Sequence, residues 1–299
     1  MTDARWPALA VEDWNETRDT FHLWTQIVGK IRMVSTPAEN HWWHVPLYVS
    51  ARGLTTGAIP YTDGVFDIEF DLLAHELVIR RSTGDRRSIA LRPMSVATFY
   101  REVTDAMLAL GIQVSIYAVP NEVDPAIPFA QDETHASYDA SSMVLFWRQL
   151  VQAQRVLREF RSGFIGKASP VHLFWGALDL AVTRFSGRPA PRYPGEVPNC
   201  PNRVMVEGYS HELSSAGFWP GGGAEGAFYS YAYPAPDGFA DAAVPTGAFY
   251  SDEYGEFLLP YEVVRASADP DRLVLDFLDA TYHAAADLAE WPARSTVTR

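Results

Sequence analysis

The segment Val65-Phe66-Asp67-Ile68-Glu69-Phe70-Asp71-Leu72-Leu73 alternates apolar and acidic side chains over most of its length. Side chains on a β-strand point to opposite faces in turn, so this alternation predicts a strand with one apolar and one acidic face. A second strand is expected over residues 76–81. The turn signal Thr83-Gly84-Asp85 separates it from a further strand at residues 88–91. Neighbouring strands joined in this way predict an antiparallel sheet.

Two segments beside these strands have the apolar periodicity of helices. Residues 11–34 carry an apolar stripe, and residues 95–110 are followed by Gly111, a residue typical of helix C-termini. Further strands are expected over residues 42–52 and 112–118. The first part of the chain therefore predicts a helix–sheet–helix unit.

A similar order of elements recurs in the second part of the chain. We expect a helix, four strands and a closing helix over residues 139–161, 171–185, 205–214, 227–233, 256–259 and 271–289. An alignment at an offset of 128 residues places His44 on His172 and Lys30 on Arg158. A common order of matches favours duplication and fusion.

The predicted fold is therefore α+β, with two fused pseudo-twofold repeats, each a mainly antiparallel sheet flanked by two helices. The first repeat is expected over residues 1–119 and the second over residues 139–299. Residues 120–138 form the connector between them, and the whole is expected to be one compact unit.

The composition is that of an acidic, aromatic-rich globular protein. The 299 residues carry a formal net charge of −13, and 13% of them are aromatic. Such a charge argues against nucleic-acid binding, and the apolar runs are far shorter than the roughly 20 residues that cross a membrane. No signal peptide is visible, and the single Cys200 fits a reducing compartment, so we expect a cytoplasmic protein. The sequence does not specify an oligomeric state.

Histidines and carboxylates are the main candidates for chemistry. His44 and His172 align between the halves, and the aligned strands place Glu69 opposite Glu212. If the strands pair, each half presents a histidine and a carboxylate on one sheet face. Such a set suits zinc, iron or manganese, but it equally suits metal-free acid–base catalysis or a structural role. Reserve candidates for metal ligands are His41, His135 and His211. No nucleotide-cofactor motif is present.

Candidate substrate contacts lie on the first helix and on its aligned copy. His22, Gln26 and Lys30 are spaced i, i+4, i+8 and share one helical face, and the second half offers Gln154 and Arg158. These stripes are either solvent faces or binding groups for an anionic substrate. Aromatic candidates for substrate contact are Trp42 and Tyr48, on the same strand face as His44.

Several phrases of the sequence together resemble an uncharacterised bacterial family. They are His22-Leu23-Trp24-Thr25-Gln26, Asn40-His41-Trp42-Trp43-His44-Val45-Pro46-Leu47-Tyr48, Thr134-His135-Ala136-Ser137-Tyr138-Asp139, the glycine-rich Gly163-Phe164-Ile165-Gly166-Lys167 with Ser169-Pro170-Val171-His172, and His211-Glu212 followed by Gly217-Phe218-Trp219-Pro220. The family is catalogued as a domain of unknown function and is common in actinobacteria and cyanobacteria. The resemblance spans nearly the full length and implies a bacterial single-family protein, but it assigns no catalytic residue.

We therefore expect an enzyme that acts on a small anionic or aromatic molecule through a His/carboxylate cluster, with or without a divalent metal. The first alternative is a non-catalytic sensor or carrier with an aromatic-lined pocket. The second is an interaction protein that exposes its aromatic residues to a partner.

Overall fold

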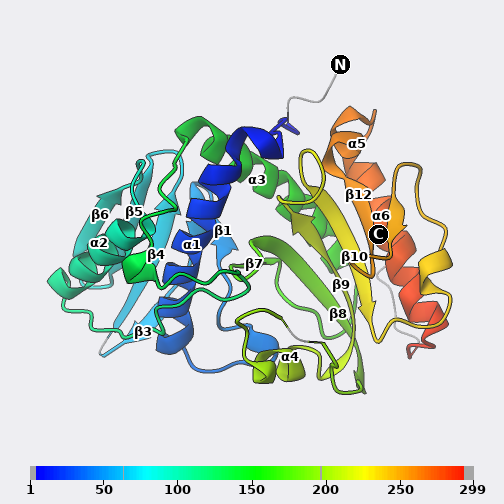
Figure 1. Cartoon of the computed structure of the whole chain (residues 1–299). Helices are drawn as coiled ribbons and strands as arrows, with labels where there is room; N and C mark the ends of the chain where they lie inside the picture. Colours follow the sequence, from blue (N-terminus) through cyan, green and yellow to red (C-terminus); the bar gives the residue numbers. More distant parts are fainter. Residues whose placement is uncertain (1–4, 63, 196, 293–299) are drawn as a thin grey trace.

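The structure is a computed structural model that describes residues 5–62, 64–195 and 197–292. It confirms the α+β class, with two antiparallel sheets of six strands each (Figure 1). The α-helices are α1 (Val11–Ser35), α2 (Val96–Ala109), α3 (Ala140–Ser162), α4 (Asn202–Gly208), α5 (Tyr261–Ala266) and α6 (Pro270–Leu288). Short 3-10 turns are η1 (Asn40–Trp42), η2 (Phe129–Gln131) and η3 (Phe239–Asp241).

The first sheet has the order β1-β2-β4-β5-β6, and β3 pairs with the start of β4. Its strands are β1 (Tyr48–Val49), β2 (Gly53–Thr55), β3 (Ile59–Tyr61), β4 (Gly64–Asp71), β5 (Glu76–Arg81) and β6 (Arg86–Ala90). The alternation in β4 has the predicted effect. Phe66, Ile68 and Phe70 are buried in the core, while Arg80 binds Asp67 and Glu69 on the opposite face.

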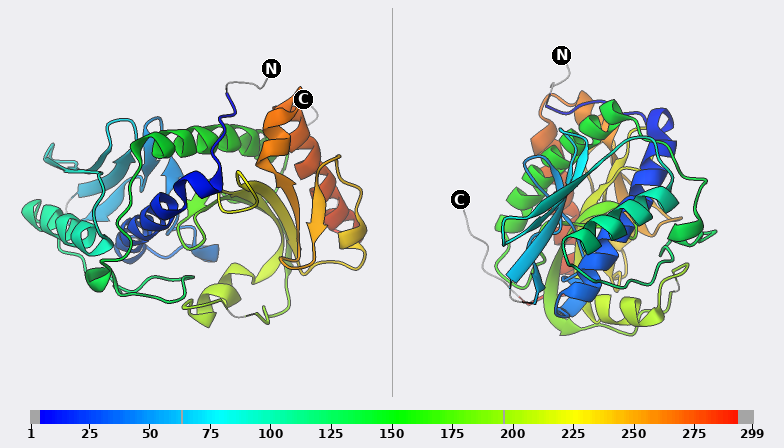
Figure 2. Two further views of the ribbon diagram at one scale, coloured as in Figure 1. Left: turned by 45° about the horizontal axis from the view of Figure 1, so that its top comes forward. Right: turned by 90° about the vertical axis from the view of Figure 1, so that its left-hand side faces the viewer.

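The second sheet has the order β11-β12-β10-β9-β8-β7, with every neighbouring pair antiparallel. Its strands are β7 (His172–Phe174), β8 (Asp179–Pro189), β9 (His211–Trp219), β10 (Ala227–Tyr233), β11 (Phe249–Ser251) and β12 (Glu256–Pro260). This sheet curves, with α6 on its convex side and α4 opposite its concave side (Figure 2).

The two sheets carry matching rows of core side chains. Reading across neighbouring strands, the rows are Leu54, Phe70, Leu77 and Ile89 in the first sheet, and Leu180, Phe218, Phe228 and Leu259 in the second. Leu47 and Leu173 exchange two backbone hydrogen bonds, of 2.9 and 2.7 Å, which join the sheets where β1 and β7 meet. The halves therefore share one strand order about a central junction.

Helices cover the core face of each sheet. Phe21 of α1 and Phe99 of α2 both pack on Phe70 of the first sheet. In the second half, α3 and α6 contact each other and pack against β9, and α3 also reaches β1 (Figure 2). Because α3 spans both halves, buried residues of both sheets belong to one hydrophobic core.

The sequence misplaced several strands. Residues 42–52 begin with η1, where His41 and Trp42 have φ values of 55° and 61°, and only Tyr48–Val49 is strand. The predicted strand over residues 171–185 is broken by a turn into the β7–β8 hairpin. The predicted strand over 205–214 begins as helix α4, and 112–118 has no strand. Apolar patterning shows burial but not where a strand reverses, so these boundaries were wrong.

The N-terminus of α3 supplies a simple stability prediction. The Asp139 carboxylate caps the helix by accepting a 2.7 Å hydrogen bond from the backbone N–H of Ser142. Replacing Asp139 with Ala should lower the free energy of unfolding by about 1 kcal/mol. Urea denaturation measures this change. The capping role is contradicted if the midpoint does not move.

Candidate functional site

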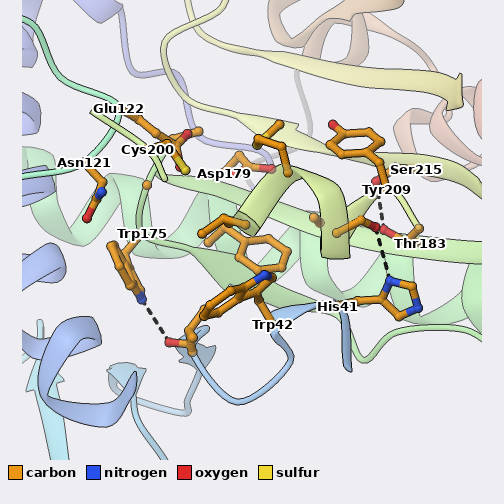
Figure 3. Close-up of a pocket in the computed structure, with 18 of the residues that line it drawn as sticks. His41, Trp42, Asn121, Glu122, Trp175, Asp179, Thr183, Cys200, Tyr209 and Ser215 are labelled. Carbon is orange, nitrogen blue, oxygen red and sulfur yellow. Dashed lines mark hydrogen bonds between the residues drawn. The ribbon is translucent and has the colours of Figure 1, made fainter. Parts of the chain in front are cut away.

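A cavity of about 1050 Å³ lies on the concave face of the second sheet. Its walls are the strands of that sheet, one flank of α1, the η1 turn, the connector near residues 117–122 and the segment around α4. Its aromatic lining consists of Trp42, Trp43, Tyr117, Phe174, Trp175, Phe185, Tyr209, Trp219, Tyr229, Tyr231 and Tyr254. Figure 3 shows Glu122, Cys200 and Asp179 toward one end and His41, Thr183 and Ser215 toward the other.

The Asp179 carboxylate is held by Tyr229, whose side chain reaches it across Gly217 on the strand between them. The Tyr229 hydroxyl of β10 donates a short hydrogen bond to the Asp179 carboxylate of β8. Gly217 on the intervening strand β9 leaves room for this contact, because an added Cβ would lie 2.5 Å from the Tyr229 hydroxyl and would overlap the Leu180 carbonyl oxygen. Burial raises the pKa of Asp179 to about 6, although the Tyr229 hydrogen bond acts in the opposite direction.

Two further carboxyl groups line the cavity near Asp179. Glu122 adopts a left-handed backbone, with φ of 59°, and its carboxylate lies against Gly176, where any Cβ would overlap it. Glu122 is accessible to water inside the cavity, yet the surrounding protein raises its pKa to about 7 by desolvation, with repulsion from Asp179 as the second cause. The same two causes raise the pKa of half-buried Glu256 to about 7.

Several other carboxylates of the protein have an arginine partner. Glu69, Glu212 and Glu225 each form an ion pair with an arginine. Among the described residues, neither Asp179, Glu122 nor Glu256 has such a pair. Their negative charges are therefore left for protons or for a ligand to balance.

The polar stripe of α1 faces inward and organises one wall. His22 Nε2 lies 2.9 and 2.8 Å from the backbone oxygens of Trp175 and Gly176. The Gln26 amide exchanges two 2.8 Å hydrogen bonds with the backbone of Asn121. Lys30 then donates a short hydrogen bond to Asn121 Oδ1. The stripe is thus not the solvent face of the helix, since Gln26 and Lys30 are fully buried.

Trp175 packs directly on α1 at Gly29. A Cβ at Gly29 would overlap the indole ring, and the Trp175 Nε1–H donates a 2.9 Å hydrogen bond to the Val45 carbonyl oxygen (Figure 3). The ring also lies under Lys30, whose Nζ is 5.6 Å from its centroid. The wall of the cavity at this point is therefore rigid and aromatic.

His41 lines the opposite end of the cavity and contacts Lys167, which lies behind it. Lys167 Nζ lies 2.6 Å from His41 Nε2, and His41 Nδ1 lies 3.1 Å from the Gly208 carbonyl oxygen. An ammonium can only donate a hydrogen bond, so His41 Nε2 accepts from Lys167. His41 Nδ1 therefore carries the ring proton and donates to the Gly208 carbonyl oxygen. Burial, supported by the positive charge of Lys167, lowers the pKa of His41 and keeps this ring neutral.

His44 and His172, the predicted central pair, do not line the cavity. His44 stacks on Trp42, and its Nδ1 accepts a 3.1 Å hydrogen bond from the backbone N–H of Glu39. His172 is 0% exposed, and neither of its ring nitrogens has a hydrogen-bond partner within the described part of the chain. Burial lowers the pKa of His172 to about 3, so this ring is neutral at physiological pH.

The predicted carboxylate partners lie elsewhere. Glu69 accepts from Ser50 and Arg80 on the outer face of the first sheet, and Glu212 pairs with Arg188 on β8. The sequence alignment placed Glu69 opposite Glu212. In the structure, however, Phe70 and Phe218 occupy corresponding positions in the core rows of the two sheets. The sequence-predicted residues therefore do not meet in one His/carboxylate cluster.

Within the described residues, the predicted metal ligands do not gather into one site. Across 5–62, 64–195 and 197–292, no three His, Cys, Asp or Glu side chains converge on a point where one ion would fit. His135 binds Asp132, and His211 binds Ser210 with its ring 5.5 Å from that of His41. The described side chains thus do not form the ligand group that zinc, iron or manganese would need. Metal binding stays a prediction from the sequence.

The remaining predicted contacts divide between the cavity and other surfaces. Lys30, His41 and Trp42 line the cavity, and Gln26 supports it through Asn121. Gln154 instead donates to the Val49 carbonyl oxygen, and Arg158 is exposed on α3. Tyr48 packs over Arg32.

Sequence reasoning missed the carboxyl groups of the cavity. Asp179 interrupts the otherwise apolar run Leu178-Asp179-Leu180-Ala181-Val182, and Tyr229 and Tyr231 alternate on one strand. A charged residue within a buried strand was the available signal for Asp179. Glu122 gave no comparable signal, because its role depends on a loop conformation.

The raised carboxyl pKa values predict a pH-dependent effect on stability. A carboxyl group whose pKa is higher in the folded than in the unfolded chain stabilises the fold at low pH, and this contribution is lost as pH rises through the folded value. For Asp179 that window runs from about pH 4 to about pH 7. As pH rises across this window, the melting temperature of the wild type should therefore fall relative to that of the Asp179→Asn variant. A constant difference at every pH would contradict the shifted pKa.

Comparisons with known proteins identify the family of the chain. No curated protein and no solved structure matches it. None of the described helices has both the length and the apolar character needed to cross a bilayer. A family model described as "Family of unknown function (DUF5996)" matches residues 6–298. Because this match spans nearly the whole sequence, the chain belongs to that family of unknown function.

Proposed function

We propose that the cavity is the active site of an enzyme that acts on a small organic molecule with an aromatic or apolar body. The observation behind it is that three carboxyl groups, which have no arginine or lysine partner among the residues the structure describes, share an aromatic-walled cavity. Asp179 and Glu122 are the proposed proton-transfer groups. Tyr229 is the proposed positioning residue, since its hydroxyl holds the Asp179 carboxylate.

The acid–base proposal is supported by the environment of the two carboxyl groups. General acid–base catalysis is most efficient when the pKa of the group lies near the working pH. Asp179, at about 6, and Glu122, at about 7, both have this property. The negative charge of Asp179 adds to the desolvation that raises the pKa of Glu122, so that protonated and ionised forms coexist near neutral pH.

The size and lining of the cavity support a small-molecule substrate. Ligand sites are typically about 300–1,000 Å³ and mostly apolar, with a few placed polar groups. The indole rings of Trp42 and Trp175 offer flat surfaces to an aromatic body. The single Cys200 supports a further proposal that the enzyme works in the cytoplasm.

The test is incubation of purified protein with a metabolite extract from a bacterium that carries the gene, followed by mass spectrometry. We expect at least one compound to be consumed by the wild type and by Asp67→Asn. Asp67 is a suitable control because it pairs with Arg80 on the first sheet. Asp179→Asn should leave that compound intact. An extract unchanged by the wild type, or consumed equally by Asp179→Asn, would sink the proposal.

A non-catalytic carrier or sensor is the second candidate, and the lining favours it at one point. Tyr209 and Tyr231 share a 3.0 Å hydroxyl contact, and Tyr193 stacks on Tyr209, so this part of the wall is built from stacked aromatic side chains. A compound that co-purifies with the protein and is returned chemically unchanged would favour this candidate.

A further inference from the structure

Lysine is nearly absent from this protein. Of the 24 lysine and arginine residues, 22 are arginine, and the two lysines are Lys30 and Lys167. Both adjoin the cavity, Lys30 as part of its lining and Lys167 through His41. Arginine cannot lose its proton in proteins, whereas a buried lysine can. A chain that uses arginine for nearly every positive charge therefore has a lysine in the lining of this cavity.

Lys30 is held by groups that do not fix its charge. The side chain is 1% exposed, and no carboxylate pairs with its Nζ in the part of the chain that the structure describes. Its hydrogen-bond partner is Asn121 Oδ1, an amide oxygen that can accept from either an ammonium or a neutral amine. Desolvation accordingly lowers the pKa of Lys30 to about 8.

The Asn121 acceptor is itself held from three sides. The Gln26 amide binds the backbone N–H and the carbonyl oxygen of Asn121, each at 2.8 Å. The Asn121 Nδ2 group donates a 2.5 Å hydrogen bond to the Asn199 carbonyl oxygen. The amide orientation is therefore fixed, with Oδ1 toward Lys30. These hydrogen bonds hold Asn121 in place, and Asn121 in turn holds the Lys30 amine in one position.

We propose that Lys30 is a nucleophilic amine that forms an imine with an aldehyde or ketone bound in the cavity. This inference rests on the proposed function and narrows its substrate class to carbonyl compounds. A lysine that is desolvated in an apolar pocket is one known way to activate an amine for this chemistry.

The chemistry balances with groups that the cavity holds. The Nζ lone pair attacks the carbonyl carbon, a C–N bond forms, and the carbonyl oxygen takes a proton to give a carbinolamine. A second proton on that oxygen lets it leave as water while the C=N bond forms, and the two protons that nitrogen gives up return to the Glu122 carboxyl group that supplies the two gained by oxygen. Glu122 is the proposed proton donor, because it directly follows Asn121 in the chain and lines the same cavity as Lys30.

The test uses benzaldehyde as probe and sodium cyanoborohydride as the reductant that traps the imine as a stable benzylamine. Peptide mapping after reaction at pH 7.5 should place the adduct on Lys30, at least about tenfold above Lys167 and the N-terminus. Lys30→Arg should lose the adduct, and Lys167→Arg should keep it. Equal labelling of all amines, or none at Lys30, would overturn the proposal.

A second variant separates reactivity from folding. Asn121→Asp places a carboxylate beside the amine and should favour the ammonium, so labelling of Lys30 should fall at pH 7.5 and recover at higher pH. A merely structural role for Asn121 would not produce this shift of the pH profile. If Lys30 is not labelled while Asp179-dependent turnover persists, only the imine is wrong. Labelling of Lys30 without any such turnover would leave the imine and remove the carboxyl mechanism.

Discussion

The Asp179→Asn variant should lose turnover by about 100- to 10,000-fold, the range that one general acid–base group contributes. The amide cannot exchange a proton near neutral pH, but it keeps the shape of the carboxyl group and can still accept from the Tyr229 hydroxyl. The fold should therefore persist. Turnover of the compound consumed by the wild type, followed by mass spectrometry, measures the loss.

Two comparisons make this expectation specific. Tyr229→Phe leaves the carboxyl group in place but removes the hydroxyl that positions it, so it should cost less turnover than Asp179→Asn. Because the lost hydrogen bond lowers the pKa of Asp179, the acidic limb of the pH–rate profile should move to higher pH. Circular dichroism should show the native fold in both variants. Turnover by Asp179→Asn within a fewfold of the wild type would exclude Asp179 as the acid–base group.

The Gly217→Ala variant should be the most damaging single-methyl change in the second sheet. Its Cβ would overlap the backbone oxygen of Leu180 and lie 2.5 Å from the Tyr229 hydroxyl. Since backbone cannot yield as a flexible side chain does, we expect a loss of about 1–3 kcal/mol in the free energy of unfolding. We also expect displacement of Tyr229 from Asp179, with lower turnover.

Gly163→Ala is the matched control, because a Cβ there would meet only the Phe160 carbonyl oxygen, at an ordinary distance of 3.6 Å. Chemical denaturation of both variants measures the difference. Similar stability of the two would show that the close approach of β8, β9 and Tyr229 at Gly217 is not as tight as described.

The fold could largely be predicted because its elements carry local signals. The acidic alternation of β4 and the apolar stripe of α1 follow from the periods of strand and helix. The hairpin turn between β7 and β8 could not, since Val171 to Phe185 is a nearly continuous apolar run. A run of that kind indicates burial in either of two strands without showing the turn between them.

The site was only partly predictable, and the difference lies in sequence separation. The i, i+4, i+8 stripe of Gln26 and Lys30 was visible because a helix places those residues on one face. Asn121, which both bind, lies about 90 residues further along the chain. The repeat alignment favoured His44 and His172 because histidine is the usual acid–base residue, yet it could not show that His172 is sealed in the core.

Equilibrium dialysis against a metabolite extract shows whether the cavity holds a small molecule. The Asp179→Asn protein should retain bound substrate, whereas the same protein with Ala177→Trp should not. Ala177 is exposed and lines the cavity, so an indole there would occupy the space without disturbing the core. We predict one or a few compounds enriched on the side of the open protein and lost from the blocked one. No enrichment, or equal enrichment by both proteins, would contradict a small-molecule site in this cavity.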